Sequence, residues 1–230
     1  VKGILNKIGD DITHLILIPH RDLHLLPLHY LLREKDFTIT YLPSLKVGID
    51  LSVRPSPVTK LLSIENPQDL LFALVESSAI TRLFPECDRI PSPNATISVV
   101  KTSLKNANGY FHFTGHAYHD PNYPRNSALI LASEPNLTLA DIFAFNTLNL
   151  QLVCLAACET GITGKEGLID EFVGLASGFL ATGVSYVVSS LWRVEERSTA
   201  LLMMQFYHYI IDQKILPAIA LNKAQNWLRQ

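Results

Sequence analysis

The chain has 230 residues, of which 48% are hydrophobic and 17% charged, so it can bury a substantial core and an ordered domain is expected. Its formal net charge is −2 and its basic residues are scattered, which gives no reason to expect nucleic acid or an anionic membrane as a partner. No stretch reaches the roughly 18 apolar residues of a membrane span. Three cysteines, an odd number, favour a reducing cytoplasm over a disulfide framework.

The first half of the chain predicts strands at residues 14–19, 37–42 and 60–64, where apolar or alternating runs end at turn-forming residues. Helices are expected at residues 69–84 and 95–106. Residues 52–59 contain two prolines and are the best linker candidate. We expect one domain over residues 1–230, with residues 1–58 as an N-terminal subregion. A start at Val1 and an end inside a helical pattern suggest a domain excised from a longer protein.

The second half predicts further strands alternating with helices. Apolar runs at residues 109–113, 148–157 and 186–192 are expected strands, and residues 128–132 form another apolar run. Thr138 and Asp141 have the spacing of a capping box, and helices are expected at 169–181, 197–212 and 218–228. Strands that are apolar throughout and alternate with helices indicate an α/β fold, a mainly parallel sheet covered by helices on both faces.

Two of the expected strands end at residues that can carry catalysis. The apolar run at 110–113 stops at Thr114-Gly115-His116, and the run at 152–157 stops at Cys158, before a loop containing glycine. Active sites of parallel sheets lie at the carboxyl ends of strands, so a thiol and an imidazole are expected at the same edge. An imidazole that takes the proton of a neighbouring thiol creates the reactive thiolate. The pattern is typical of a cysteine peptidase.

Acyl transfer also needs two N–H donors directed at the developing oxyanion. A cysteine that enters a turn can supply its own backbone N–H, so the first expected donor is the amide of Cys158. The second is expected in the turn around His116, at Gly115 or Ala117. Glycine at position 115 would let the backbone approach a substrate closely.

The other cysteines are expected to be structural, because a free cysteine on an apolar strand is usually a small buried side chain. Cys154 lies inside its apolar run, and Cys87 lies in a Pro-Glu-Cys-Asp segment interpreted as a loop. A zinc site using Cys154 and Cys158 would need further ligands nearby, so no metal is expected. His112 faces away from its phenylalanine neighbours and is expected to pack beneath the sheet.

Three segments in order resemble the CHAT domain, a member of the caspase-like cysteine peptidases that include separases and caspases. They are FHFTGH at 111–116, LAACETG at 155–161 and VVSSLWRV at 187–194, and the segment at 17–31 is similar to the opening motif of the family. The resemblance implies a caspase-hemoglobinase fold, a three-layer sandwich. It also implies His116 as general base, Cys158 as nucleophile, a protein or peptide substrate, and neither metal nor organic cofactor.

The resemblance also carries finer implications. In this family the residue after the histidine is usually glycine, and its amide helps to form the oxyanion hole; here it is Ala117, a departure from the pattern. In separase-like relatives an acidic residue after the Leu-Trp motif pairs with a basic P1 side chain, and the matching residues are Glu195 and Glu196. Alternatively, both glutamates favour the first turn of the next helix. Trp192 is expected either to line the substrate pocket or to pack in the core.

Three functions are weighed on these residues. The leading hypothesis is a cytoplasmic endopeptidase with a Cys-His dyad, acting in signalling or defence and regulated by a partner or by helical repeats outside this chain. The second is a scaffold or interaction module that keeps the fold and performs little chemistry. The third is a glutamine amidotransferase, which the order of histidine before cysteine disfavours.

Overall fold

A computed structural model describes residues 7–20, 23, 26–32, 37–50, 60–120, 122–159, 174–191 and 194–230. For residues 49, 50, 158 and 159 it describes the backbone alone. The expected linker at 52–59, the first part of the expected helix at 169–181 and Trp192 lie outside the described residues.

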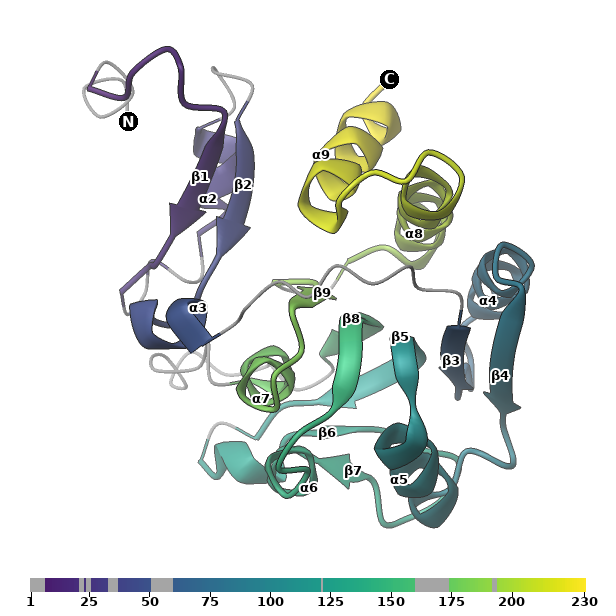
Figure 1. Ribbon diagram of the computed structural model, residues 1–230. Coiled ribbons are helices and arrows are strands. Elements are labelled where there is room, and N and C mark those ends of the chain that lie inside the picture. The colour runs from purple at the N-terminus through teal and green to yellow at the C-terminus, as the bar shows by residue number, and fades with distance from the viewer. Residues whose placement is uncertain are drawn as a thin grey trace.

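A seven-stranded sheet forms the centre of the molecule (Figure 1). Five of its strands are parallel, in the spatial order β4 (Glu86–Pro91), β3 (Lys60–Glu65), β5 (Asn108–Tyr118), β8 (Asn149–Glu159) and β9 (Tyr186–Ser189). The short strand β6 (Ala128–Leu129) pairs antiparallel with the end of β5 and with β7 (Leu137–Thr138). The expected parallel sheet is confirmed, and its strand order reverses between β3 and β5, where open α/β sheets bind ligands.

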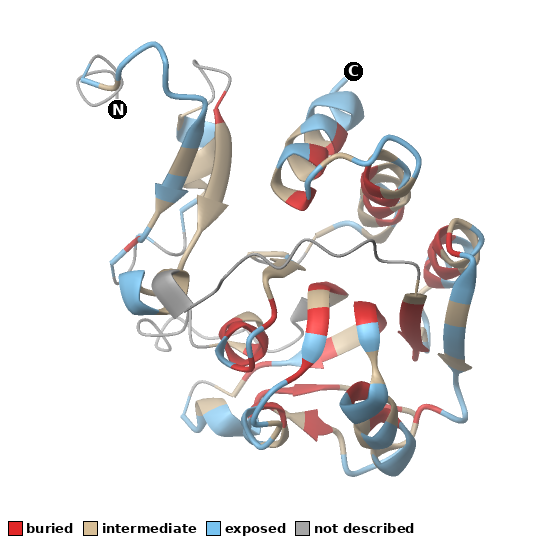
Figure 2. Ribbon diagram, in the orientation of Figure 1, coloured by how far each residue is buried: buried red, intermediate tan, exposed pale blue. Residues whose placement is uncertain are grey.

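Helices cover both faces of this sheet, which completes three layers. Helices α4 (Ala73–Thr81), α8 (Glu196–Ile211) and α9 (Pro217–Leu228) contribute buried side chains to one apolar cluster, and α5 (Ile97–Asn106), α6 (Leu139–Phe143) and α7 (Leu175–Ala181) to the other. Figure 2 shows the buried residues along the sheet and on the helix faces turned toward it. Residues of β5 alternate between the two clusters: Tyr110 lies in the first, and Phe111 and Phe113 lie in the second.

The N-terminal region forms a second, smaller sheet. Strands β1 (His14–Leu17) and β2 (Thr38–Tyr41) pair in parallel, with the short helices α2 (Leu28–Leu31) and α3 (Leu45–Asp50) beside them (Figure 1). Two strands alone are marginally stable, and here β2 packs against α9, where Asn222 Nδ2 donates a hydrogen bond of 3.1 Å to the carbonyl of Phe37. Whether residues 1–230 form one domain stays a prediction.

Two expectations about the region from 67 to 91 are wrong. The helix expected from residue 69 begins only at Ala73, because residues 67–70 form a turn in which the Leu70 amide donates to the Pro67 carbonyl at 2.7 Å. Cys87 lies on the edge strand β4, not in a loop. Edge strands expose polar side chains and therefore lack the apolar pattern by which buried strands are predicted.

The predicted capping box is confirmed at the start of α6. The Thr138 hydroxyl accepts from the Asp141 amide, and the Asp141 carboxylate accepts from the Thr138 amide, each at 3.1 Å. Lys101 of α5 binds the same carboxylate at 2.6 Å. The box thus fixes α6 and joins it to α5 on the same face of the sheet.

Candidate active site

Strands β5 and β8 place His116 beside Cys158. The two strands continue to Tyr118 and Glu159, past the ends expected from the sequence, so both residues lie within strands and not in the turns that follow them. The parallel register pairs His116 directly with Cys158. Neighbouring strands lie about 4.8 Å apart, so the two residues are backbone neighbours near the carboxyl ends of adjacent strands.

Close packing against the next strand explains why β5 does not end at its glycine. A Cβ atom on Gly115 would stand 2.8 Å from the carbonyl oxygen of Asn66, so the small residue permits the approach of Asn66. The Asn66 amide donates to the Thr114 carbonyl at 2.9 Å, and its side chain donates to the Ile130 carbonyl at 3.0 Å. The Ile130 amide donates in turn to the His116 carbonyl at 2.9 Å. The backbone of the histidine is therefore held from the β3 side.

The two nitrogens of the His116 imidazole differ in their contacts. Its Nε2 lies 2.8 Å from Asp69 Oδ1, in the turn before α4, and the histidine side chain is 17% exposed against 86% for the aspartate. Its Nδ1 is buried and has no hydrogen-bond partner in the described part of the chain. An ionised carboxylate only accepts hydrogen bonds, so Nε2 carries the proton and Nδ1 presents a lone pair.

Asp69 is a residue of the site that the sequence alone does not indicate, because its pattern places Asp69 at the beginning of a helix. One signal was present. A polar residue follows closely on the apolar strand β3, and the carboxyl ends of parallel strands share one edge of the sheet.

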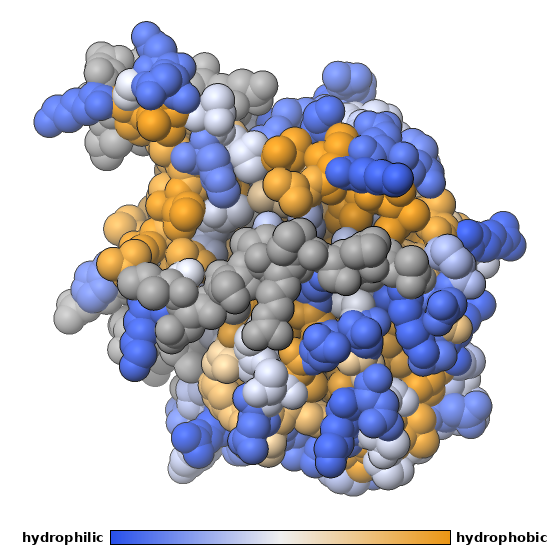
Figure 3. Space-filling view, in the orientation of Figure 1, coloured by the Kyte–Doolittle hydropathy of each residue, from blue (hydrophilic) through white to orange (hydrophobic). Residues whose placement is uncertain are grey.

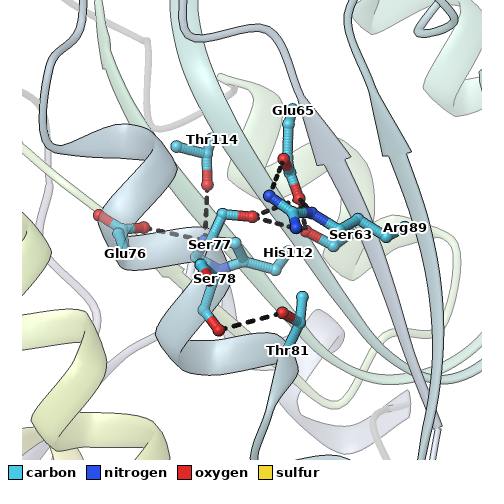
Figure 4. Close-up of polar contacts among 9 residues, drawn as sticks. All are labelled: Ser63, Glu65, Glu76, Ser77, Ser78, Thr81, Arg89, His112 and Thr114. Atoms are coloured by element: carbon cyan, nitrogen blue, oxygen red, sulfur yellow. Dashed lines mark hydrogen bonds and ion pairs between the residues drawn. The ribbon is translucent and has the colours of Figure 1, made fainter.

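A buried polar layer surrounds His112 on the α4 and α8 face of the sheet, and Figure 4 shows its contacts with Glu76 and Thr114. The Nε2 of His112 lies 2.9 Å from Glu76 Oε1 and 2.8 Å from the Thr114 hydroxyl, and its Nδ1 lies 3.3 Å from the Tyr207 hydroxyl. His112 is fully buried, as expected from the sequence. These bonds join β5 to both helices and fix the strand that carries His116 four residues further on.

A second buried group ties β3 to its neighbours (Figure 4). Glu65 is 1% exposed and receives two hydrogen bonds from Arg89 of β4, at 2.6 and 2.9 Å. The Ser63 hydroxyl donates to it at 3.2 Å, and the Ser77 hydroxyl of α4 also donates to it. A buried carboxylate needs such compensation, and the bidentate pairing with arginine supplies it.

The two other cysteines are unsuited to act as nucleophiles. Burial raises the pKa of the Cys87 thiol to about 11. Cys154 is fully buried, and burial raises its pKa well above the ordinary value of a thiol. Thiolate formation at neutral pH is therefore suppressed at both positions.

Ala117, the expected second oxyanion donor, lies inside the sheet. It is 2% exposed and pairs in register with Leu129 of β6 on one side and with Glu159 of β8 on the other. The turn expected around His116 is thus replaced by continuous strand, because the hairpin of β6 and β7 extends the ladder of β5 beyond the end of β3. The part of Ala117 and the Cys158 amide in an oxyanion hole stays a prediction.

The two glutamates expected near the substrate have partners within the protein. Glu195 caps α8 by accepting from the amides of Arg197 and Ser198, at 3.0 and 2.6 Å, and hydrogen bonds from Ser198 lower its pKa. Glu196 accepts a hydrogen bond from the Phe72 amide, just before α4. A role of either carboxylate in substrate binding stays a prediction, as does that of Trp192.

Within the described residues, no cluster of three or more histidine, cysteine or acidic side chains is arranged to hold a metal ion. In the same part of the chain, no helix is both long and apolar enough to cross a membrane.

The three layers and the strand order define an α/β protein with the caspase-like fold. Gingipain R, described as an Arg-specific cysteine proteinase, is similar with a TM-score of 0.64 at 13% identity, covering 99% of this chain and 61% of that one. The complex of the RgpB pro- and mature domains of Porphyromonas gingivalis is similar with a TM-score of 0.62 at 12% identity, covering 99% and 62%. The chain thus spans about three-fifths of the length of these structures, and at such identities the likeness establishes the fold.

The model of the CHAT domain family matches residues 3–230. The chain therefore belongs to the CHAT domain family, as the three sequence motifs predict. Comparison with curated protein sequences gives no match.

Proposed function

We propose that this CHAT domain is a cysteine endopeptidase in which Cys158 is the nucleophile and His116 the general base. The observation that carries the proposal is the register pairing of the two residues on adjacent parallel strands, together with the buried His116 Nδ1, which has no hydrogen-bond partner among the described residues. Membership of the CHAT family and the gingipain-like fold support the same reaction class.

The chemistry follows from the two ring nitrogens. His116 Nδ1 takes the proton of the Cys158 thiol, and the thiolate attacks the carbonyl carbon of the scissile peptide bond. The imidazolium then donates that proton to the departing amine, and Cys158 remains bound to the acyl group as an acyl-enzyme. A water molecule, deprotonated by the same nitrogen, attacks the thioester and releases the second product, and Cys158 recovers its proton.

The substrate class is a protein or peptide, and a basic P1 residue is the first preference to test. The similar gingipain R is named Arg-specific, and an acidic pair follows the motif at 187–194 in this chain. Pairing with a substrate would require Glu195 or Glu196 to exchange its present partner for the P1 side chain.

One observation favours the alternative, a scaffold or interaction module with little chemistry. Ala117 is buried between two strands, and its amide would have to leave the sheet to serve an oxyanion. In the peptidase proposal, a partner or a repeat domain outside this chain separates the ends of β5 and β8 and so activates the enzyme. We expect this regulation to act in a cytoplasmic signalling or defence pathway.

Cleavage of a fluorogenic peptide library by the full-length protein, with its partners supplied, tests the proposal. Loss of cleavage in both Cys158→Ala and His116→Ala, with Cys87→Ala still active, supports the dyad. Cys87 is the matched control because it lies on the edge strand β4, outside the proposed machinery. Undiminished cleavage in either dyad variant refutes the assignment, and no cleavage by the natural sequence at any P1 residue favours the scaffold.

A further inference from the structure

We infer that Asp69 is a positioning residue for the catalytic histidine, so that the site works as a Cys158–His116–Asp69 triad in which the third member is presented by a surface turn. The inference rests on the proposed function, because it assigns a role in that reaction. Its first evidence is the 2.8 Å contact between Asp69 Oδ1 and His116 Nε2.

The exposure of the two partners argues against a purely structural pair. The Asp69 side chain is 86% exposed, whereas that of His116 is 17% exposed. An ion pair or hydrogen bond with so exposed a partner contributes little to stability, because water competes for the carboxylate. The contact does have a chemical consequence, since it favours the tautomer in which Nε2 holds the proton.

The tautomer set by Asp69 is the one that the proposed reaction needs. A carboxylate at Nε2 fixes the proton on that nitrogen and leaves Nδ1 as the basic atom. Nδ1 is buried and lacks a hydrogen-bond partner within the described residues, and the backbone of His116 is paired with that of Cys158. The same contact stabilises the imidazolium that forms when Nδ1 accepts the thiol proton. With the opposite tautomer, Nδ1 would carry hydrogen and could not act as the base.

The turn that presents Asp69 is closed by a backbone hydrogen bond. The Leu70 amide donates to the Pro67 carbonyl at 2.7 Å, and Gln68 adopts a left-handed conformation with φ of 47°. Two residues beyond the turn, the Phe72 amide donates to Glu196 at the start of α8. Glu196 therefore joins the segment that carries Asp69 to the start of α8. We expect this bond to help hold Asp69 in place, although Glu196 does not contact the aspartate in any bond described above.

Nitrogen-15 NMR of the imidazole rings tests the pairing without any catalytic step. The measurement is made at pH 8.5 in the Cys158→Ala protein, with the His116 signals assigned by their loss in His116→Gln. We expect the Nε2–H tautomer to dominate, and Asp69→Asn to lower its population, with Asp69→Glu preserving most of it. Asp212→Asn is the matched control, because Asp212 pairs with His208 at 2.6 Å on the surface of α8.

Alkylation of Cys158 by iodoacetamide, followed by peptide mass spectrometry, tests the consequence for the thiol. General-base catalysis contributes about 10²- to 10⁴-fold, and an exposed orienting group supplies part of that, so we expect Asp69→Asn to slow alkylation on the order of tenfold. Glu196→Ala, which removes the acceptor for Phe72, is expected to slow it less. Asp69→Glu is expected to retain most of the rate, and Asp212→Asn all of it.

The outcomes separate the two proposals. An unchanged His116 tautomer in Asp69→Asn overturns the positioning role. The positioning role is also overturned if His116→Ala slows alkylation and Asp69→Asn does not. That result would still support the Cys158–His116 dyad. If His116→Ala also leaves alkylation unchanged, the proposed function fails together with the triad, whatever tautomer the ring adopts. Circular dichroism of each variant verifies that the fold is retained, which the exposure of Asp69 leads us to expect.

Discussion

Removing one buried hydroxyl tests the buried polar layer around His112. Tyr207 and His112 are both fully buried, and the hydroxyl lies 3.3 Å from the histidine Nδ1. Glu76 accepts from the opposite ring nitrogen, so Nδ1 is the acceptor and the tyrosine hydroxyl is its donor. Tyr207→Phe keeps the ring packing on Phe84 and Phe206 and deletes the hydroxyl, which also forms a hydrogen bond with the buried Cys154 thiol.

The expected cost follows from the burial of the group left behind. A typical intramolecular hydrogen bond contributes about 0.5–1.5 kcal/mol net, and a buried acceptor left without a partner costs about 1–3 kcal/mol. We expect the free energy of unfolding to fall by about 2 kcal/mol. For a chain of this size the melting temperature changes by roughly 2–4 °C per kcal/mol, so it should fall by several degrees.

Urea unfolding monitored by circular dichroism, together with a thermal melt, measures this change. Tyr123→Phe is the matched control, because Tyr123 is 69% exposed and its change should stay within about 0.5 kcal/mol. If Tyr207→Phe is as stable as Tyr123→Phe, the hydroxyl is not holding His112, and the description of the layer is wrong.

Two further substitutions test the surroundings of the site. Gly115→Ala should lower the free energy of unfolding in urea by about 1–3 kcal/mol, because the added Cβ would lie 2.8 Å from the Asn66 carbonyl oxygen. If the variant is as stable as the natural sequence, Asn66 and Gly115 are not so closely packed. Burial opposes the ionisation of Asp141, but hydrogen bonds from Lys101 and Thr138 outweigh it and lower its pKa below 3.8. Its contribution to stability is therefore present above about pH 4 and lost as the pH falls through the lowered value. Asp141→Asn should lower the free energy of unfolding by about 0.5–2 kcal/mol at pH 7. This loss should become smaller as the pH is lowered toward 2.5, and a loss that is constant with pH would contradict the pairing of Asp141 with Lys101 and Thr138.

The sequence predicted most of the sheet because its central strands are apolar. Such runs predict the strands β3, β5, β8 and β9, and the closing helices α8 and α9 are also predicted from the sequence. The strand β4 was missed since its edge position leaves most of its residues exposed. The ends of β5 and β8 were misplaced, because pairing between distant segments extends them beyond residues that usually end a strand.

Some residues of the candidate site can be predicted from the sequence, and others are brought there only by the fold. The strand positions of His116 and Cys158 follow from local pattern and family motif, and the structure pairs them in register. Asp69 comes from a turn 47 residues before the histidine, and only the folded sheet brings its carboxylate to Nε2. The partner of Glu196 likewise lies 124 residues away, so its bond to Phe72 has no local signature.

The central claim is that Cys158 gives its proton to His116, and the pH dependence of Cys158 alkylation by iodoacetamide tests it most directly. A thiol with an ordinary pKa of about 8.5 is roughly 0.1% ionised at pH 5.5, so its reaction slows about tenfold for each pH unit below that pKa. We predict a rate that changes little between pH 6 and 8 in the natural sequence and falls about tenfold per unit in His116→Ala, with Cys87 and Cys154 inert in both. The same steep pH dependence in both proteins would contradict the account.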